Sequence, residues 1–379
     1  MKTDASQRVT TIMPRLFQVL FDRSPASESL LRALFYVTSS RSNRVLASFA
    51  ITCLFFVPPA SPCCGQETPQ SITVGTWNLE WFYDDDKSDN RSKLSKEKAA
   101  PSKAEWNWKL NSVAEVVAKT KPYIMAFQEV ENRKVIFDLK NLLRSKYNLS
   151  YRIAFVEGFD TFTEQDVAII FRDGCVEMSR REQNEEQWKS KQFKNLSKHL
   201  FAKFEWGSGS QKEKLTLLNV HLRAMADRED LRIQQIKLIR EWINEEIKSG
   251  GNVIVVGDLN TEHVHGKQTA KTDIGILRGL NDDDLTNDLF DANEFIPEAK
   301  RGSHFTGKQF DRILFSAALR QDTPHRKDLV FTTASVASNI VIRGKRDNGN
   351  VRWNNLYSIP QAERDISDHY PVIARFDFR

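Results

Sequence analysis

Six short apolar segments, each ending in polar side chains, constrain the fold of this chain more than any other feature of its sequence. Their apolar residues are largely continuous rather than alternating, which is typical of strands in sheets that are covered on both faces. Two amphipathic helices are expected between them, from Trp108 to Lys119 and from Leu231 to Lys248. The pattern predicts an α/β domain. The six segments are Ser71–Asn78, Tyr123–Glu129, Asp166–Phe171, Leu215–His221, Asn252–Asp258 and Phe310–Phe315.

The composition is that of an ordinary folded protein. Of the 379 residues, 40% are hydrophobic and 28% are charged, which excludes collagenous, disordered and multi-spanning chains. No internal repeat is visible. We therefore expect residues 66–379 to form one large α/β domain.

Residues 1–65 differ from the rest and are expected to form a leader with a signal peptide. Two arginines precede an apolar run at 45–57, and a segment rich in proline and small residues follows at 58–61. The run is shorter than the roughly 20 residues that a membrane-spanning helix needs. We expect a secreted or periplasmic protein with no membrane span in its mature form. The alternatives are a buried element of the fold and a lipid anchor on Cys63 or Cys64.

The leader also accounts for most of the excess positive charge. The whole chain has a net charge of +5, but residues 1–65 carry seven Lys or Arg and three Asp or Glu, so the remainder is only +1. The net charge of the expected mature domain therefore does not by itself indicate nucleic-acid binding. Cys175 is the one cysteine clearly outside the leader region, so no disulfide framework is expected.

The polar side chains at the ends of the apolar segments are carboxylates, amides and imidazoles. Hydrolysis of a phosphodiester requires neutralising the charge that develops on the phosphoryl oxygens, aligning a water and moving its proton. A hard divalent cation such as Mg²⁺ prefers oxygen ligands and keeps several waters, so one or two protein carboxylates suffice. These residue types suffice for metal-assisted phosphoester hydrolysis.

Six short motifs give the chain a resemblance to the endonuclease/exonuclease/phosphatase superfamily from about residue 72 to the C-terminus. Each motif is weak alone, but all six occur in the order found in that superfamily. The resemblance implies a four-layer α/β/β/α sandwich, with two mixed sheets flanked by helices, as in deoxyribonuclease I. The motifs are Thr76-Trp77-Asn78-Leu79-Glu80, Phe127-Gln128-Glu129, Asn219-Val220-His221, Gly257-Asp258-Leu259-Asn260, Phe310-Asp311-Arg312-Ile313 and Ser367-Asp368-His369-Tyr370-Pro371.

The resemblance implies four residues on the metal side. Glu129 matches the principal metal-ligating carboxylate, and Asn78 matches the amide beside the metal and the scissile phosphate. Asp368 lies where the superfamily has a metal-side carboxylate. Glu80 matches an acidic ligand of a second metal or of its outer shell. The expected cofactor is Mg²⁺, with Mn²⁺ or Ca²⁺ as alternatives.

The resemblance also implies five catalytic residues. Asp258 would orient or deprotonate the attacking water, and Asn260 would hold the phosphate or that water. Their i, i+2 spacing places both side chains on one face of an extended segment. His369 would contact the phosphoryl oxygen and transfer a proton, and Asp311 would hydrogen-bond a catalytic imidazole and raise its pKa. His221 completes the set.

Asn78, Asn260 and His221 are also the expected substrate contacts. Deoxyribonuclease I and sphingomyelinases have a histidine at the position of His221, whereas apurinic endonucleases have a tyrosine. With the export signal, this predicts a secreted endonuclease acting on DNA, with RNA as a second polymer and no stable protein partner. The alternatives are a sphingomyelinase-like or small-molecule phosphoesterase, for which residues 159–162 are the nearest membrane-docking candidate, and a catalytically silent binding module.

Two polar, basic stretches, residues 84–103 and 343–364, are expected to be surface loops that could contact a nucleic-acid backbone. At least one of the nearby Trp106 and Trp108 is expected in the core. His263, His265 and His304 lack the spacing of a zinc site, so we expect them to be surface histidines.

Overall fold

The computed structural model describes residues 68–183, 195–263 and 267–379. The expected leader, with its apolar run at 45–57, lies outside the described residues and stays a prediction, as does the surface position of His265. Within the described ranges, no helix has the length and apolar character needed to cross a membrane.

The first sheet is mixed and contains six strands in the order β11-β12-β1-β2-β4-β3. The central strand β1 pairs in parallel with β2 and antiparallel with β12. The carboxyl ends of β1 and β2 therefore lie at the same edge of the sheet. The strands are β1 (Ser71–Phe82), β2 (Ile124–Val130), β3 (Arg152–Ala154), β4 (Asp166–Phe171), β11 (Leu329–Val336) and β12 (Val372–Phe378).

The second sheet is also mixed and has the order β5-β6-β7-β8-β10-β9. Its central strand β8 is parallel to β7 and antiparallel to β10. The end of β7, the end of β8 and the beginning of β10 therefore meet at one edge. The strands are β5 (Cys175–Ser179), β6 (His199–Trp206), β7 (Glu213–His221), β8 (Val253–Asp258), β9 (Leu289–Asp291) and β10 (Asp311–Ser316).

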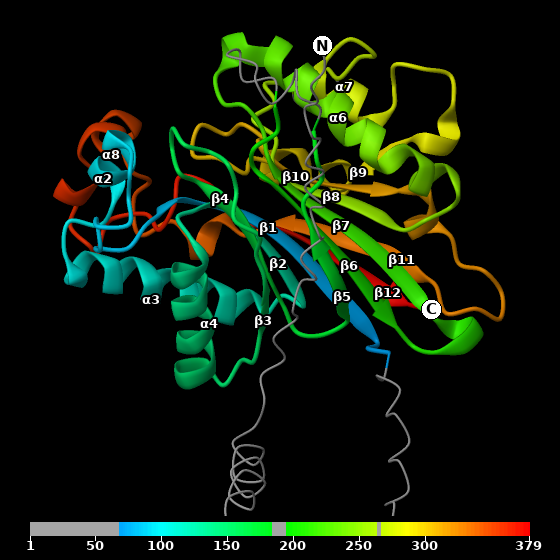
Figure 1. The fold of residues 1–379 in the computed structure, drawn as a ribbon, viewed down its shortest axis with the longest axis horizontal. Helices are drawn as coiled ribbons and strands as arrows, with labels where there is room; N and C mark the ends of the chain where they lie inside the picture. Colours follow the sequence, from blue (N-terminus) through cyan, green and yellow to red (C-terminus); the bar gives the residue numbers. More distant parts are fainter. Residues whose placement is uncertain (1–67, 184–194, 264–266) are drawn as a thin grey trace, which may run out of the picture. The chain divides into compact units, whose positions relative to one another are not determined.

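Helices cover the outer face of each sheet. Helices α3 and α4 pack on the first sheet, and α6 and α7 pack on the second (Figure 1). The expected helix at 108–119 begins earlier, because the side chain of Ser102 accepts a hydrogen bond from the Glu105 N–H and caps it. The helices are α2 (Lys93–Lys98), α3 (Lys103–Thr120), α4 (Arg133–Tyr147), α6 (Glu229–Lys248), α7 (Asp273–Arg278) and α8 (Gly349–Asn355).

The two sheets pack face to face around a buried apolar core. Alternate residues of β2 divide between layers: Ile124 and Ala126 face the other sheet, whereas Met125 and Phe127 face α3 and α4. This alternation follows from the two-residue repeat of an extended chain. Both faces of the central strands are thereby buried, which confirms the four-layer α/β/β/α sandwich expected from their continuous apolar runs.

The two basic stretches expected as loops contain short helices. Helix α2 lies within 84–103 and α8 within 343–364, and the Lys98 ammonium donates a hydrogen bond to the carbonyl of Trp353. Both stretches therefore belong to one packed unit at the side of the sandwich. Trp106 is buried as expected of a core residue.

Candidate active site

Polar side chains from both sheets meet at one end of the sandwich. Asn78 lies near the end of β1, and Glu129 lies near the end of β2. In the second sheet, the register pairs Asp258 with His221 on one side and with Asp311 on the other. The sandwich therefore gathers five of the expected site residues from five strands.

A glycine allows β8 to lie close to β7 at this point. Gly257 has φ +146°, and a Cβ added there would lie 1.8 Å from the carbonyl oxygen of Val220. No other residue could occupy this position without moving the strands apart. The glycine thus sets the position of Asp258, the next residue.

The amide of Asn78 connects the two sheets. Its Nδ2 donates hydrogen bonds to Oε1 of Glu129 at 3.1 Å and to Oδ2 of Asp258 at 2.9 Å. Its Oδ1 accepts from the backbone N–H of Glu80 at 2.9 Å. Asn78 therefore holds two carboxylates, one from each sheet, close to a common point.

His369 lies just before β12 and forms a buried pair with Asp311. Its Nδ1 is 2.8 Å from Oδ2 of Asp311, and its Nε2 lies 3.9 Å from Oδ2 of Asp258. Burial acts to lower the pKa of His369, but the carboxylates of Asp311, Asp258 and Asp368 outweigh burial and raise this pKa well above its ordinary value. The ring is therefore a cation at neutral pH, with Nε2 directed into the site.

The backbone beside His369 is fixed by a buried tryptophan. The indole Nε1 of Trp77 donates a 2.9 Å hydrogen bond to the carbonyl of His369, and the Ser367 hydroxyl accepts from the His369 N–H at 3.1 Å. Trp77 in the first motif thereby supports the histidine of the last motif.

Asp258 has a second imidazole beside it. Nε2 of His221 lies 3.4 Å from Oδ2 of Asp258, and burial lowers the pKa of His221 well below its ordinary value. Burial also raises the pKa of Asp258, although the His369 cation opposes this shift. Asn260 donates its backbone N–H to Oδ1 of Asp258 at 3.0 Å, and its side chain donates to the carbonyl of Leu222 at 3.2 Å. His221 is thus neutral, whereas His369 is charged.

Glu129 is held in an electrostatically unfavourable place. Burial, together with the nearby Asp368 carboxylate, raises its pKa to about 7. Its Oε2 accepts a hydrogen bond from the backbone N–H of Trp81 at 2.9 Å. Oδ1 of Asp368 is buried and has no hydrogen-bond partner among the described residues.

These oxygens suit a hard divalent cation. Two neighbouring carboxylates with an unpartnered buried oxygen and an adjacent amide are the ligand types that such a cation binds. Glu129 and Asp368 would hold it beside Asn78, whose Nδ2 donates to Glu129, and its charge would offset the repulsion between the two carboxylates.

Glu80, expected as a further metal ligand, has other partners. The Arg352 Nε donates to its two carboxylate oxygens at 2.8 and 2.9 Å, and the Asp368 N–H donates to Oε2 at 3.1 Å. A metal would have to displace this arginine. The geometry assigns Glu80 to holding the backbone of Asp368. Arg352, from the basic stretch at 343–364 that was expected on the surface, is buried.

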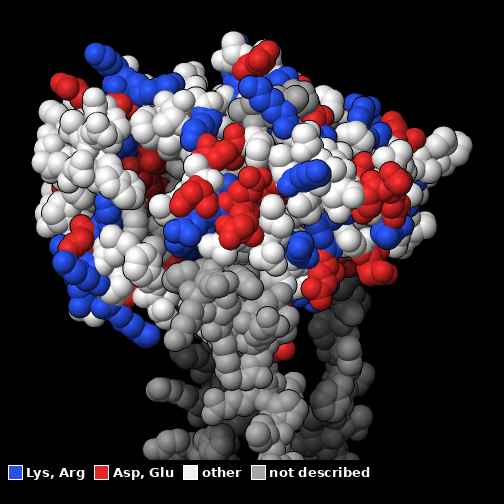
Figure 2. Space-filling view, turned by 90° about the horizontal axis from the view of Figure 1, so that it is seen from above, with Lys and Arg blue, Asp and Glu red and all other residues white. Residues whose placement is uncertain are grey.

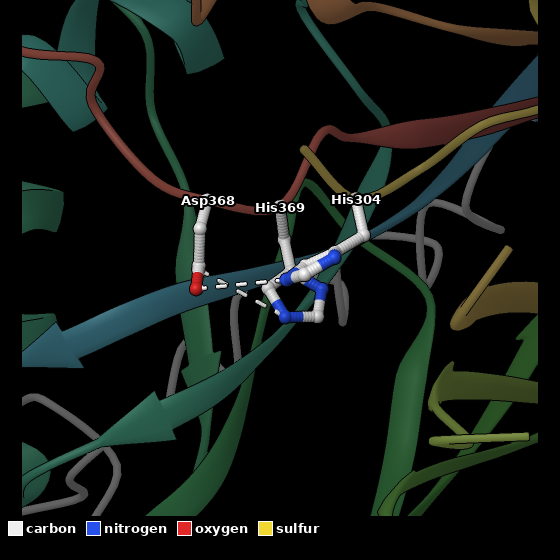
Figure 3. A group of neighbouring side chains, drawn as sticks. All are labelled: His304, Asp368 and His369. Atoms are coloured by element: carbon white, nitrogen blue, oxygen red, sulfur yellow. Dashed lines mark ion pairs between the residues drawn. The ribbon is translucent and has the colours of Figure 1, made fainter. Parts of the chain in front are cut away.

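The expectation that His304 is a surface residue is wrong. Its exposed fraction is 9%, its backbone forms an antiparallel bridge with His369, and the two ring centroids are 4.7 Å apart. Figure 3 shows both rings beside Asp368. The one feature of the sequence that could have placed His304 in the site is that it lies only a few residues before Asp311. His263 is partly exposed and lies 2.8 Å from Glu229.

Three polar residues support the site from below. Gln128 and Asn219 belong to the motifs named above, but no role was expected for them, and the sequence did not point to Lys109 at all. Gln128 donates to Oδ1 of Asn219 at 2.7 Å, and Asn219 donates to the carbonyls of Phe127 and Ala168 at 3.0 Å. These bonds join the two sheets directly beneath the site. Lys109, on α3, donates to the carbonyl of Ile366 at 2.6 Å, and burial lowers its pKa to about 8.

Two face-to-face sheets between helices, with carboxylates, amides and imidazoles gathered at one end, define a metal-dependent phosphoesterase. The sequence matches the model of the Endonuclease/Exonuclease/phosphatase family over residues 75–369, and the chain belongs to this family. The protein is accordingly a divalent-metal-dependent hydrolase of phosphodiesters. All nine expected site residues lie within the matched range. No curated protein sequence matches the chain.

Solved structures share this fold at low sequence identity. The human Nocturnin catalytic domain with bound sulfate aligns with a TM-score of 0.52 and 15% identity, covering 82% of this chain and 94% of that one. An endonuclease/exonuclease/phosphatase from Bacteroides vulgatus aligns with a TM-score of 0.51 and 15% identity, covering 82% of this chain and 100% of that one. Humanized D. rerio TDP2 aligns with a TM-score of 0.50 and 16% identity, covering the same shares of the two chains. These similarities confirm the fold.

Proposed function

We propose that the protein is a secreted, Mg²⁺-dependent endonuclease that hydrolyses DNA, and also RNA. The observation that carries the chemistry is the placement of two imidazoles next to Asp258, one neutral (His221) and one cationic (His369). Paired groups whose pKa values are pushed apart by their surroundings are typical of acid–base catalysis. The polymer assignment has separate support.

In the reaction, Asp258 orients the attacking water and accepts its proton, and burial supports this role because it raises the pKa of Asp258 above its ordinary value. Neutral His221 stabilises that carboxylate, and Asn260 supports its loop. His369, fixed by Asp311, donates from Nε2 to a phosphoryl oxygen as negative charge develops there. Glu129 and Asp368, with Asn78 beside them, would hold the metal, which would supply charge neutralisation and substrate orientation when bound.

The choice of nucleic acid is supported by an aromatic and cationic platform beside the site. Trp353 on α8 is 66% exposed, and the Lys98 ammonium lies 4.5 Å from the centre of its ring. The same ammonium lies 5.7 Å from the Trp81 ring, whose backbone contacts Glu129. Exposed aromatic rings next to cations stack nucleobases. The preference rests on this local platform, since acidic and basic side chains are interspersed on the face in Figure 2.

A sphingomyelinase-like enzyme is the second candidate, because Phe159 and Phe162 are each 60% exposed on the loop before β4. Tyr83 ties that loop to the end of β1 by donating to the carbonyl of Thr163. Two exposed aromatic side chains on one loop suit insertion into a membrane interface.

A substrate panel distinguishes the two candidates. Purified protein is assayed on plasmid DNA, single-stranded DNA, RNA, sphingomyelin vesicles and bis(p-nitrophenyl) phosphate, each with Mg²⁺ or EDTA. Trp353→Ala should weaken single-stranded DNA binding by about 5- to 100-fold, the contribution of stacking one base. The same variant should hydrolyse the small diester normally. Faster turnover of sphingomyelin than of any polymer, abolished by the double variant Phe159→Ser/Phe162→Ser, would refute the nuclease assignment.

Secretion rests on the leader, whose basic flank and apolar run at 45–57 precede the domain. N-terminal sequencing of the protein recovered from periplasm and culture medium tests it. Recovery of the intact N-terminus in the cytoplasmic fraction alone would contradict export.

A further inference from the structure

His304, Asp368 and His369 present three metal-binding groups to one point. One ligand atom from each residue lies within 4.8 Å of the others. Nε2 of His304 is 3.7 Å from Oδ2 of Asp368, and Nε2 of His369 is 3.9 Å from Oδ1 of the same carboxylate. Figure 3 shows both imidazoles on one side of Asp368.

The two rings are oriented by their other nitrogens. Nδ1 of His304 is 2.7 Å from the Thr306 hydroxyl, and Nδ1 of His369 is 2.8 Å from Oδ2 of Asp311. Metal-binding histidines nearly always have such a partner, which leaves the opposite nitrogen free for the ion. Both Nε2 atoms therefore face the position of a metal, and Nε2 of His369, protonated in the metal-free protein, would release its proton when the ion binds.

The backbone fixes the spacing between the two histidines. His304 and His369 form an antiparallel bridge, and the Phe305 N–H donates to the carbonyl of Asp368 at 2.8 Å. The Tyr370 N–H donates to the carbonyl of Ser303 at 2.6 Å. The three ligand groups thus come from two segments that are held together independently of any ion.

The ligand set of two imidazoles and one carboxylate favours a different metal ion from the carboxylate pair of Glu129 and Asp368. Mg²⁺ prefers oxygen ligands, whereas imidazole favours Zn²⁺ and related transition metals. Ligand atoms around a tetrahedral Zn²⁺ lie roughly 3.4 Å apart, given bonds of about 2.0–2.1 Å. The Nε2 atoms of His304 and His369 lie only a few tenths of an ångström beyond this spacing from the carboxylate of Asp368, each from a different oxygen.

We propose that His304, Asp368 and His369 form a Zn²⁺ site that inhibits the enzyme. The inhibitory part rests on the proposed function, in which Asp368 holds the catalytic metal and Nε2 of His369 faces the phosphate. A zinc ion would occupy both groups. His304 has no part in that chemistry and would serve to make the site selective for the transition metal.

Binding is tested on the full-length protein after removal of metals, with Co²⁺ as a spectroscopic probe and Zn²⁺ measured by calorimetry. His304→Gln should weaken Zn²⁺ binding by more than about 100-fold, since even outer-shell partners contribute 10- to 100-fold. It should also abolish the visible absorption of bound Co²⁺. Thr306→Val, which removes only the orienting hydroxyl, should have an intermediate effect.

His263→Gln is the matched control, because His263 belongs to a second group with Glu229 and Asp273. In that group Arg232 already pairs with Asp273, at 2.6 Å. The control should bind Zn²⁺ as the wild type does. Equal Zn²⁺ affinity of wild type and His304→Gln, or a loss of binding in His263→Gln instead, would overturn the site.

Inhibition is tested with Mg²⁺ in excess on bis(p-nitrophenyl) phosphate. Wild type should lose activity as Zn²⁺ is added, whereas His304→Gln should keep its Mg²⁺-supported rate at the same Zn²⁺ concentration. If Zn²⁺ binds through His304 and the rate does not fall, or if Zn²⁺ itself supports turnover, the inhibitory role is overturned. If the protein hydrolyses no phosphodiester, the proposed function fails, and the Co²⁺ spectrum still decides whether the site exists.

Discussion

The amide nitrogen of Asn78 donates a 2.9 Å hydrogen bond to Oδ2 of Asp258, although the two residues lie in different sheets and 180 positions apart. The same nitrogen donates to Glu129. The distance between the metal side and the water-activating side of the site therefore depends on how the two sheets pack. The buried bond from Gln128 to Asn219 maintains that packing.

Replacing Asn78 by alanine should remove both hydrogen bonds and leave two carboxylates without their shared donor. We expect kcat/KM to fall by about 100- to 1000-fold, the range for losing one donor in a preorganised site. The free energy of unfolding should drop by roughly 1–3 kcal/mol. Steady-state kinetics and urea denaturation measure the two effects. The exposed Asn354→Ala serves as control, and equal kinetics in both variants would contradict the role of Asn78.

Asp311→Asn should lower the rate and shift its pH dependence. Asp311 raises the pKa of His369, and hydrolysis uses the protonated ring, so activity is lost as pH rises through that pKa. Without the carboxylate the pKa falls, and the alkaline limb should move to lower pH. The maximal rate should fall by about 100- to 10,000-fold. A pH–rate profile checks this, with exposed Asp322→Asn as control; an unmoved alkaline limb would count against the pair.

Glu129→Gln should stabilise the metal-free protein at alkaline pH. The folded-state pKa of Glu129 is about 7, against an ordinary value of 4.5. Between these values the folded state holds a proton that the unfolded state has lost, so stability falls as pH rises through this window. The variant should gain at most about 3 kcal/mol at pH 8 and nothing near pH 4. Thermal unfolding in EDTA measures the difference; a variant less stable than wild type at pH 8 would contradict this account.

Glu129 should also make metal binding depend on pH. The carboxylate must lose its proton to bind a cation, so the apparent Mg²⁺ affinity should weaken as pH falls below about 7. Calorimetric titration of Mg²⁺ from pH 5.5 to 8.5 tests this prediction. Affinity that does not change over that range would show that Glu129 does not bind the ion.

Arg352→Met should destabilise the fold, because it leaves the buried Glu80 carboxylate unpaired beside Asp368. Removing one partner of a buried ion pair costs about 3–5 kcal/mol. The double variant Glu80→Gln/Arg352→Met should recover part of the loss. Arg343→Met, which breaks a more exposed pair with Glu115, should cost less than about 1 kcal/mol. Similar unfolding curves for the two arginine variants would contradict the buried role of Arg352.

Local patterns in the sequence determined much of the fold. All six predicted strands are present, because a continuous apolar run of this length is compatible with burial on both faces of a strand. Helix α6 begins within two residues of its predicted start, since its apolar spacing is a local property. The other six strands in the described part of the chain were not predicted. Among them, the edge strands β3 and β9 have only three residues each, which carry too little periodicity to be recognised.

The sequence by itself also indicated that the polar residues at the strand ends, from Asn78 to His369, belong to one site. It did not determine which contacts these residues make there or which further residues join them. Glu80 pairs with Arg352 across 272 positions, and His304 bridges to His369. Such contacts form only when packing of the two sheets and their flanking loops decides which polar groups are buried together. Burial keeps His221 neutral, whereas the carboxylates packed around His369 outweigh burial and keep that ring a cation, so the tertiary structure alone decided these two charges.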